Sequence, residues 1–393
     1  MVQTTTIAGV PIAKIGHGLM SMSWVPEPPS DEQCFESIIA GIKATPPDVK
    51  VFLNSGEFYG MPPNITANLE LLNRFFTKYP EYAERTFLSV KGAILLDEKG
   101  FSLDSSPAGL ERSINNIIDK LGPNKKLDLF EPARIDPKVP IEETMAVLNK
   151  FVESGKIGAI GLSECSAATL TRAAKVGKVA AVEIEVSLWS YEEETRKVIA
   201  TAKELGTIVA AYSPLGRGFL TGQVKPDEMH KDDHRSHMPR FQGEAVKNNM
   251  NLVSALKEIA EKKNITPAQL CLAWVCSLGP HVVPIPSSTR ATRTLENLSS
   301  ASIELSEEDQ EAIKQALEAN PVSGDRYPKP GMALLWGYPN QFVRGAVVAR
   351  PTAAAAHGEA LRLIMKHTGT GRSVAPFVTT ALLVASGYIP VTP

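Results

Sequence analysis

Short, continuous runs of apolar residues alternate with longer amphipathic stretches along most of the chain. A strand that is buried on both faces, as in a parallel sheet, has such a run. The runs predict eight strands: Ile15–Met20, Val49–Asn54, Thr86–Lys91, Leu127–Phe130, Ile157–Leu162, Ala180–Val186, Thr207–Tyr212 and Val282–Ile285. Before them, Thr4–Ile7 and Pro11–Ile15 flank Ala8-Gly9, which predicts a small N-terminal β-hairpin.

The stretches between the strands have helical periodicity. They predict helices over Asp31–Ala44, Thr66–Lys78, Ser106–Leu121, Ile141–Ser154, Ala167–Lys175, Glu192–Leu205 and Val246–Lys263. Ser30 is a suitable N-cap, and Gly122-Pro123 is a helix-stop signal. Eight strands alternating with helices favour a parallel barrel or a doubly wound sheet. Because no G-x-G-x-x-G motif follows the first strand, we predict an α/β fold of the (β/α)₈ TIM-barrel type.

Two segments interrupt this alternation. Gly216–Glu244 is a long polar insertion, and its His230, His234 and His237 have a spacing that would suit a metal on one helical face. The segment has no apolar run to hold a helix, so we expect a solvated lid over a cofactor and no metal. Beyond about Trp336 the composition shifts to Ala, Val and Thr. We predict a barrel domain over 1–335 and a C-terminal extension over 336–393 of uncertain structure, either a disordered or partner-binding tail or a reading-frame artefact.

Composition narrows the class of protein. The 393 residues are 43% hydrophobic and 21% charged, which allows a large core, and an α/β barrel commonly uses about 250 residues or more as one domain. A net charge of −2 without a basic run argues against nucleic acid or an anionic membrane as a partner. The first residues do not resemble a secretory signal, and the four cysteines form no C-x-x-C pair. We expect a soluble cytoplasmic protein with reduced thiols.

Four residues follow the strands at positions where a barrel carries its chemistry. Catalytic groups lie at the C-terminal ends of barrel strands, and Asn54, Tyr59, Lys91 and Glu131 occupy such positions. A lysine close to a tyrosine favours the phenolate and lowers the phenol pKa from about 10 toward neutrality. Such a tyrosine can donate a proton to a carbonyl oxygen while hydride reaches the carbon. A Schiff-base aldolase using Lys91 is an alternative reading.

Several segments in the same order resemble the aldo-keto reductases. They are Val51–Gly60, Phe87–Gly92, Gly161–Glu164, Glu185–Ser190, Ala211–Gly218, Pro284–Arg290 and Arg293–Leu298. Within that superfamily, Asn54 and Asp128–Arg134 look most like the fungal pyridoxal reductases. The resemblance implies a monomeric enzyme that reduces pyridoxal to pyridoxine, or another aldehyde, with NADPH. A non-catalytic NADPH-binding regulatory subunit remains open because the family's catalytic residues are altered.

The family tetrad is Asp, Tyr, Lys and His, and this chain matches it only at Tyr59 and Lys91. Asn54 replaces the Asp, and Glu131 replaces the His. We interpret the two changes as compensating. Glu131 then either balances the charge of Lys91 or stays protonated in a dry pocket and donates a hydrogen bond to the carbonyl; a salt bridge to Arg134 is a further alternative. The resemblance also implies that Trp24 contacts substrate, although a packing role is open.

The resemblance implies an NADPH site built in three parts. Tyr212 would stack on the nicotinamide, with Ser163 and Glu183 near its carboxamide; Glu183 replaces the usual Gln and Glu164 the usual Asn. Ser213 and Leu215 would cover the pyrophosphate, and Arg217 is a further cofactor-binding candidate. The adenosine end would contact Ser287, Ser288, Thr289, Arg290, Arg293, Glu296 and Asn297. Arginine binds phosphate oxygens in pairs, which suits the 2′-phosphate, and cations at a helix start favour an anion between them.

Overall fold

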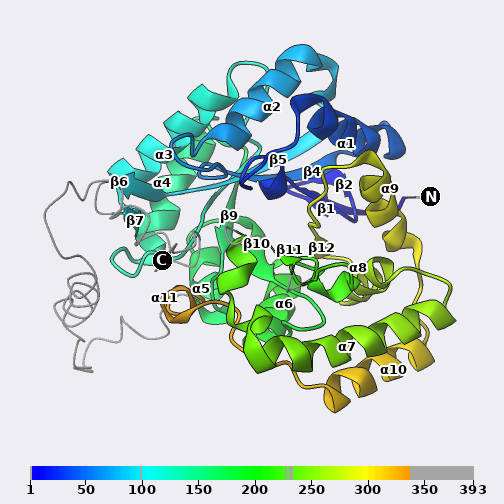
Figure 1. Ribbon diagram of the computed structural model, residues 1–393. Helices are drawn as coiled ribbons and strands as arrows, with labels where there is room; N and C mark the ends of the chain where they lie inside the picture. The colour runs from blue at the N-terminus through cyan, green and yellow to red at the C-terminus, as the bar shows by residue number, and fades with distance from the viewer. Residues whose placement is uncertain (1, 98–99, 226–227, 230–232, 337–393) are drawn as a thin grey trace, which may run out of the picture.

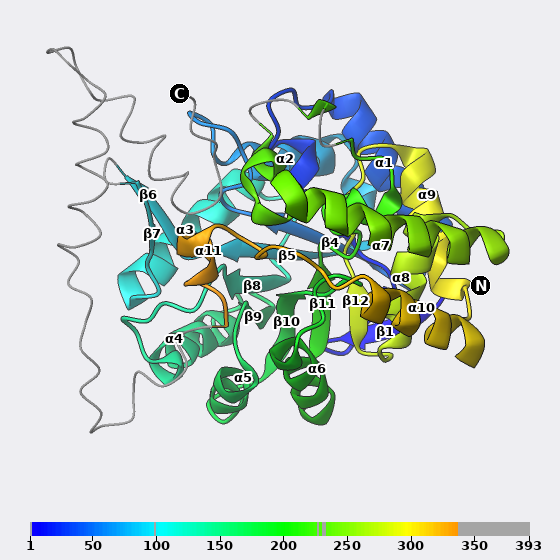
Figure 2. The same ribbon diagram turned by 60° about the horizontal axis from the view of Figure 1, so that its bottom comes forward.

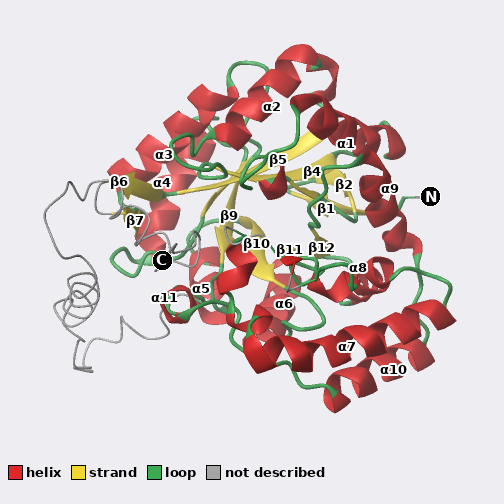
Figure 3. Ribbon diagram, viewed as in Figure 1, coloured by secondary structure: helices red, strands yellow, loops and turns green. Residues whose placement is uncertain are grey.

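The computed structural model describes residues 2–97, 100–225, 228–229 and 233–336. Its centre is an eight-stranded parallel sheet in the order β12-β11-β10-β9-β8-β5-β4-β3, and helices surround it (Figure 1, Figure 3). The strands are β3 (His17–Gly18), β4 (Val51–Gly56), β5 (Thr86–Gly92), β8 (Leu129–Pro132), β9 (Ala159–Ser163), β10 (Val179–Glu185), β11 (Ile208–Tyr212) and β12 (Val282–Pro284).

The sheet closes on itself between its first and last strands. Gly18 pairs with Ser287 in a parallel bridge, and the amide of Gly16 donates to the carbonyl of Pro284 at 2.9 Å. A Cβ on Gly18 would lie 2.8 Å from the carbonyl oxygen of Ile285, so glycine is required where the two edges meet. The closure confirms the predicted (β/α)₈ barrel.

The predicted N-terminal hairpin is confirmed as β1 (Thr4–Ile7) and β2 (Val10–Ala13). Its Ile7 and Ile12 are buried and pack with Phe52, Phe87 and other residues inside the barrel. The hairpin therefore closes one end of the barrel with apolar side chains. Buried polar side chains lie toward the other end, at the carboxyl ends of the strands.

The helices follow the predicted alternation, with additions near the C-terminal half. They are α1 (Asp31–Ala44), α2 (Ala67–Lys78), α3 (Pro107–Leu121), α4 (Ile141–Glu153), α5 (Ala167–Ala174), α6 (Glu193–Leu205), α7 (Gly243–Lys262), α8 (Pro267–Ser277), α9 (Ala291–Ser299), α10 (Glu307–Ala319) and α11 (Lys329–Met332). Ser30 caps α1 as predicted, because its side chain accepts a hydrogen bond from the amide of Gln33. Helices α7 and α10 lie side by side on the outside (Figure 2).

Some elements differ from the prediction. The first barrel strand is only His17–Gly18, and an additional antiparallel hairpin, β6 (Ile94–Asp97) and β7 (Gly100–Leu103), follows β5. The Gly216–Glu244 insertion, for which no helix was predicted, contains short 3₁₀ helices in its described part. Among its histidines, His230 lies outside the described residues, and no group that could hold a metal is found within the described part of the chain.

The predicted C-terminal extension falls almost wholly outside the described residues, which end at Trp336. The carbonyl of Trp336 accepts a hydrogen bond from the amide of Ser166 at 2.9 Å, so the chain as far as this residue is tied to the barrel. The boundary between the two predicted domains stays a prediction. Within the described ranges, every helix is too short or too polar to cross a membrane.

Candidate active site

Four buried polar side chains converge toward the carboxyl ends of four barrel strands. Asn54 lies on β4, Lys91 on β5, Glu131 on β8 and Glu183 on β10, and all four are almost fully buried. Register brings two of them together directly, since Lys91 lies opposite Glu131 in the β5–β8 pair. Three of the four were predicted as catalytic residues. The fourth, Glu183, was expected at the nicotinamide carboxamide.

Glu183 and Asn54 hold Lys91. The Lys91 ammonium lies 2.9 Å from a carboxylate oxygen of Glu183 and donates to the Asn54 amide oxygen at 2.7 Å. The Asn54 amide nitrogen also donates to Glu183 at 2.6 Å, while Glu131 is farther from Lys91, at 4.0 Å. Glu183 is thus the nearest counter-charge of Lys91. An amide at position 54 is sufficient because this glutamate supplies the negative charge.

Glu131 faces a site that already contains one carboxylate for one ammonium. Burial, the charge of Glu183 and a hydrogen bond with Glu183 raise the pKa of Glu131 well above its ordinary value. The hydroxyl of Ser89 donates to Glu131 at 3.2 Å. Two carboxyl groups that share a buried site cannot both ionise easily. The geometry therefore favours the expected alternative in which Glu131 is protonated.

The charge of Lys91 is stabilised by its surroundings. Burial alone would lower the pKa of Lys91, but its charged neighbours, the Glu183 carboxylate foremost, raise it above its ordinary value. A lysine must be neutral to attack a carbonyl and form a Schiff base. The ionised Lys91 argues against the aldolase reading.

Tyr59 is fixed in the loop after β4, beside Lys91. The Lys91 ammonium lies 5.2 Å from the centre of the Tyr59 ring, and Trp24 packs on the same ring with centroids 5.6 Å apart. The loop is anchored by Glu57, which sequence reasoning missed. Its amide donates to the carbonyl of Lys91 at 2.7 Å, and its carboxylate accepts from Asn116 at 2.8 Å.

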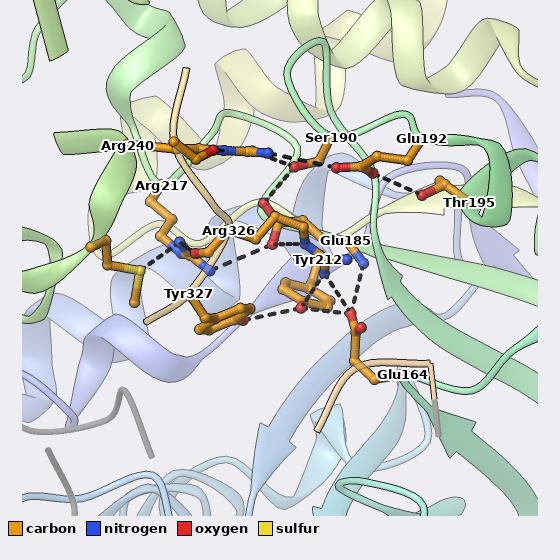
Figure 4. A network of polar contacts seen from close by, with 12 residues as sticks. Glu164, Glu185, Ser190, Glu192, Thr195, Tyr212, Arg217, Arg240, Arg326 and Tyr327 are labelled. Carbon is orange, nitrogen blue, oxygen red and sulfur yellow. Dashed lines mark hydrogen bonds and ion pairs between the residues drawn. The ribbon is translucent and has the colours of Figure 1, made fainter. Parts of the chain in front are cut away.

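A second polar cluster lies at the ends of β9, β10 and β11 (Figure 4). The Tyr212 hydroxyl donates to Glu164 at 2.7 Å. The Arg326 guanidinium donates to Glu164 at 2.9 Å, to Glu185 at 3.0 Å and to the Tyr212 hydroxyl at 3.0 Å. Arg217, which was expected to contact cofactor, lies 3.5 Å from Glu185. The cluster joins predicted cofactor residues to two residues, Arg326 and Glu185, that were not predicted.

Charge balance governs ionisation in this cluster. Burial alone would raise the pKa of Glu185, but the guanidinium groups of Arg326, Arg217 and Arg240 lower it to about 2. Burial and the charge of Glu164 raise the pKa of Tyr212 well above its ordinary value. Tyr212 therefore remains a neutral hydrogen-bond donor.

The residues around Tyr212 fit a nicotinamide carboxamide. Within the described residues, the Ser163 hydroxyl, one oxygen of Glu164 and one nitrogen of Arg326 are buried without a hydrogen-bond partner. Buried polar groups normally have partners, and an amide supplies both an acceptor and donors. Glu164 and Ser213 also have φ of 50° and 49°, a left-handed conformation that costs energy for a non-glycine residue and that recurs at ligand sites as well as in turns.

The predicted adenosine end is assembled at the start of α9. Arg290 and Arg293 are exposed, and neither forms an ion pair within the described part of the chain. The hydroxyl of Ser288 accepts from the amide of Arg290 at 3.3 Å, and that of Ser287 donates to the carbonyl of Gly18 at 2.9 Å. Two cations without counter-ions at a helix start fit a phosphate group.

The other predicted contacts at this end are partly engaged. Thr289 accepts from Gln33 through its carbonyl at 3.1 Å, Glu296 accepts from the Thr266 hydroxyl at 2.7 Å, and Asn297 is mostly buried. Ser213 and Leu215 lie in the turn after β11. The predicted residues of both ends thus lie after the carboxyl ends of barrel strands or at the start of α9, and their contact with a cofactor stays a prediction.

Fold and site together are those of a barrel oxidoreductase. A family model described as the aldo/keto reductase family matches residues 14–318, and this chain belongs to that family. It is 37% identical over 329 residues to the probable pyridoxal reductase 2 of Schizosaccharomyces pombe, covering 82% of this chain and 97% of that protein. It is 36% identical over 337 residues to the aldo-keto reductase yakc [NADP(+)] of the same yeast, covering 84% and 95%.

A solved structure supports the fold. The glycerol dehydrogenase of Gluconobacter oxydans superposes with a TM-score of 0.70 at 22% identity, covering 82% of this chain and 97% of that chain. At this identity the likeness concerns the barrel alone. Members of the aldo/keto reductase family generally use NAD(P)H.

Proposed function

We propose that this protein reduces a carbonyl compound with NADPH, and that pyridoxal, which yields pyridoxine, is its substrate. The observation that carries the proposal is the juxtaposition of Tyr59 with a buried, ionised Lys91 at the carboxyl ends of the strands. The similarity to a relative named as a probable pyridoxal reductase supports this choice of substrate.

Each side chain of the Lys91 site has a separate role in the proposed reduction. When bound, NADPH supplies the hydride. Tyr59 donates the proton to the carbonyl oxygen, because the nearby Lys91 charge favours the phenolate that remains. Glu183 and Asn54 orient the Lys91 ammonium. The protonated Glu131 donates its single proton to the Glu183 carboxylate, so it acts on the reaction through the Glu183 that orients Lys91 rather than by touching the carbonyl.

The phosphate-binding end favours NADPH over NADH. Arg290 and Arg293 are exposed cations at the start of α9. Their planar guanidinium groups are suited to pairs of phosphate oxygens. We therefore expect the 2′-phosphate to be bound there, in agreement with the NADP(+) named for one relative.

The test is to mix purified protein with NADPH and pyridoxal and to follow the loss of the reduced-nicotinamide absorbance. We expect turnover, and we expect Tyr59→Phe to reduce it by about 10²-fold or more while NADPH still binds. Turnover of another aldehyde but not of pyridoxal would overturn the substrate assignment alone. NADPH binding without turnover of any aldehyde would overturn the catalytic proposal and favour a regulatory role.

A further inference from the structure

Arg326 reaches the site from outside the barrel repeat. It lies between α10 and α11, far along the chain from the strands, and its side chain is only 3% exposed. It contacts two carboxylates and one phenol hydroxyl, each at about the length of a normal hydrogen bond. Figure 4 shows the guanidinium among Glu164, Glu185 and Tyr212.

The partners of Arg326 come from three different strand ends. Tyr212 ends β11, Glu185 ends β10, and Glu164 directly follows β9. Glu185 and Tyr212 lie opposite each other in the β10–β11 pair, and the amide of Glu185 donates to Glu164 at 3.2 Å. Arg326 adds a side-chain bridge that joins all three residues. Glu164 also has a φ of 50°, and a residue in that conformation needs its surroundings to hold it there.

We propose that Arg326 is a positioning residue for the nicotinamide end of NADPH. This inference rests on the proposed function. One oxygen of Glu164 is bound by Arg326 and Tyr212, and this leaves its other, unpartnered oxygen to accept from the carboxamide. The hydroxyl of Tyr212 is held at the same time, which fixes the ring on which the nicotinamide would stack.

Binding of NADPH and of a fragment that lacks the nicotinamide distinguishes this positioning role from a general effect on protein stability. NADPH contains the nicotinamide, whereas 2′-phospho-ADP-ribose contains only the part that would bind at α9. We expect Arg326→Gln to weaken NADPH binding by about tenfold or more, because it leaves Glu164 without its cation. Binding of 2′-phospho-ADP-ribose should change by less than about twofold. Both affinities are measured by calorimetric titration.

Arg326→Lys gives a milder variant if the glutamine variant does not fold. A lysine keeps the charge but cannot donate to Glu164, Glu185 and Tyr212 through a rigid fork. We expect a smaller loss of NADPH affinity than in Arg326→Gln, again without loss of the fragment. Retained fragment binding also shows that the variant is folded.

Arg240→Lys is the matched control. Arg240 is also a buried arginine of this network, with 5% exposure, but it donates to Ser190 and to the carbonyl of Gly324. We expect this variant to be less stable and to bind both ligands with unchanged affinity. Equal weakening of both ligands in the Arg326 variants, or no weakening of NADPH, would overturn the inference. A wild-type protein that binds neither ligand would instead overturn the proposed function, and the inference with it.

Discussion

Two polar clusters lie at the carboxyl end of the same barrel, and they differ in the ratio of cations to carboxyl groups. The Lys91 cluster sets one ammonium against the carboxyl groups of Glu131 and Glu183. The Arg326 cluster sets three guanidinium groups, those of Arg217, Arg240 and Arg326, near Glu185. Glu131 and Glu185 are both almost fully buried.

The two buried glutamates therefore differ in protonation for one physical reason. Desolvation raises the pKa of both, but only Glu185 has enough nearby cations to reverse the effect, and its pKa falls to about 2. Glu131 has a carboxylate neighbour, and its pKa rises. The number of cations at each strand end decides which carboxyl can donate a hydrogen bond and which can only accept one. A neutral Glu131 leaves Lys91 paired with the one carboxylate of Glu183, whereas the ionised Glu185 is held by the guanidinium groups around it.

Removing the single cation of the first cluster should have the largest effect. We expect Lys91→Met to lower turnover by about 10²- to 10⁴-fold, because Tyr59 loses the charge that favours its phenolate. NADPH affinity should be nearly unchanged, which separates this effect from loss of the cofactor site. The measurement is turnover at saturating NADPH beside a binding titration. Full activity in the variant would contradict the role given to this lysine.

Neutralising the carboxylate of the second cluster should affect folding more than chemistry. Glu185→Gln leaves three guanidinium groups without this counter-charge. The folded pKa of Glu185 is about 2 against an ordinary 4.5, which corresponds to about 3 kcal/mol of stability at neutral pH.

The sign of this contribution can be checked by pH. Because the folded pKa is depressed, the stability is present above the unfolded value and is lost as pH falls from 4.5 toward about 2. Urea unfolding of wild type and Glu185→Gln should therefore differ most at neutral pH and converge in acid. Curves that stay parallel across this window would show that Glu185 is not the group responsible.

Glu131→Gln should change the free energy of unfolding less than Glu185→Gln does, and in the opposite direction. The folded pKa of Glu131 is raised, so its neutral form favours the fold. Its contribution is present below the unfolded value of about 4.5 and is lost as pH rises toward the folded pKa. Glutamine imitates the neutral form, and we expect the variant to be at least as stable as wild type at neutral pH.

The same variant tests the role of Glu131 in turnover. An amide still donates a hydrogen bond, so turnover should stay within about tenfold of wild type at neutral pH. The fall in activity that ionisation of Glu131 causes at higher pH should disappear. A pH profile that keeps this fall in the variant would assign it to another group.

Much of the barrel and the first cluster could be predicted from the sequence. Buried parallel strands have continuous apolar runs, and the polar residue that ends each run marks the site, as at Asn54 and Lys91. Helix α8 could not be predicted from amphipathic periodicity. Its residues Leu270–Val275 are all buried, so this stretch has no polar face to mark it as a helix. The short strand His17–Gly18 is defined by closure of the barrel, which no local pattern reports.

Long-range charge pairing could not be predicted. The sequence shows Glu183 and Glu164 where the family usually has amides, but it does not show which cation each glutamate meets. Arg326 lies 162 residues from Glu164 along the chain, and its neighbours carry no signal for a buried position. The predicted monomer, cytoplasmic location and C-terminal extension stay predictions.

Loss of an exposed ion pair should have the smallest effect on stability. Its comparison with the buried cluster shows how much of the effect depends on burial. Arg172 donates to Glu142 through two nitrogens, at 2.8 and 2.6 Å, so its geometry is as good as that of Arg326. The two side chains are 42% and 43% exposed, and water screens such a pair. We expect Arg172→Gln to change the free energy of unfolding by less than about 1 kcal/mol in urea titrations. A loss as large as that of Glu185→Gln would mean that hydrogen-bond geometry, rather than desolvation, sets the strength of the buried cluster.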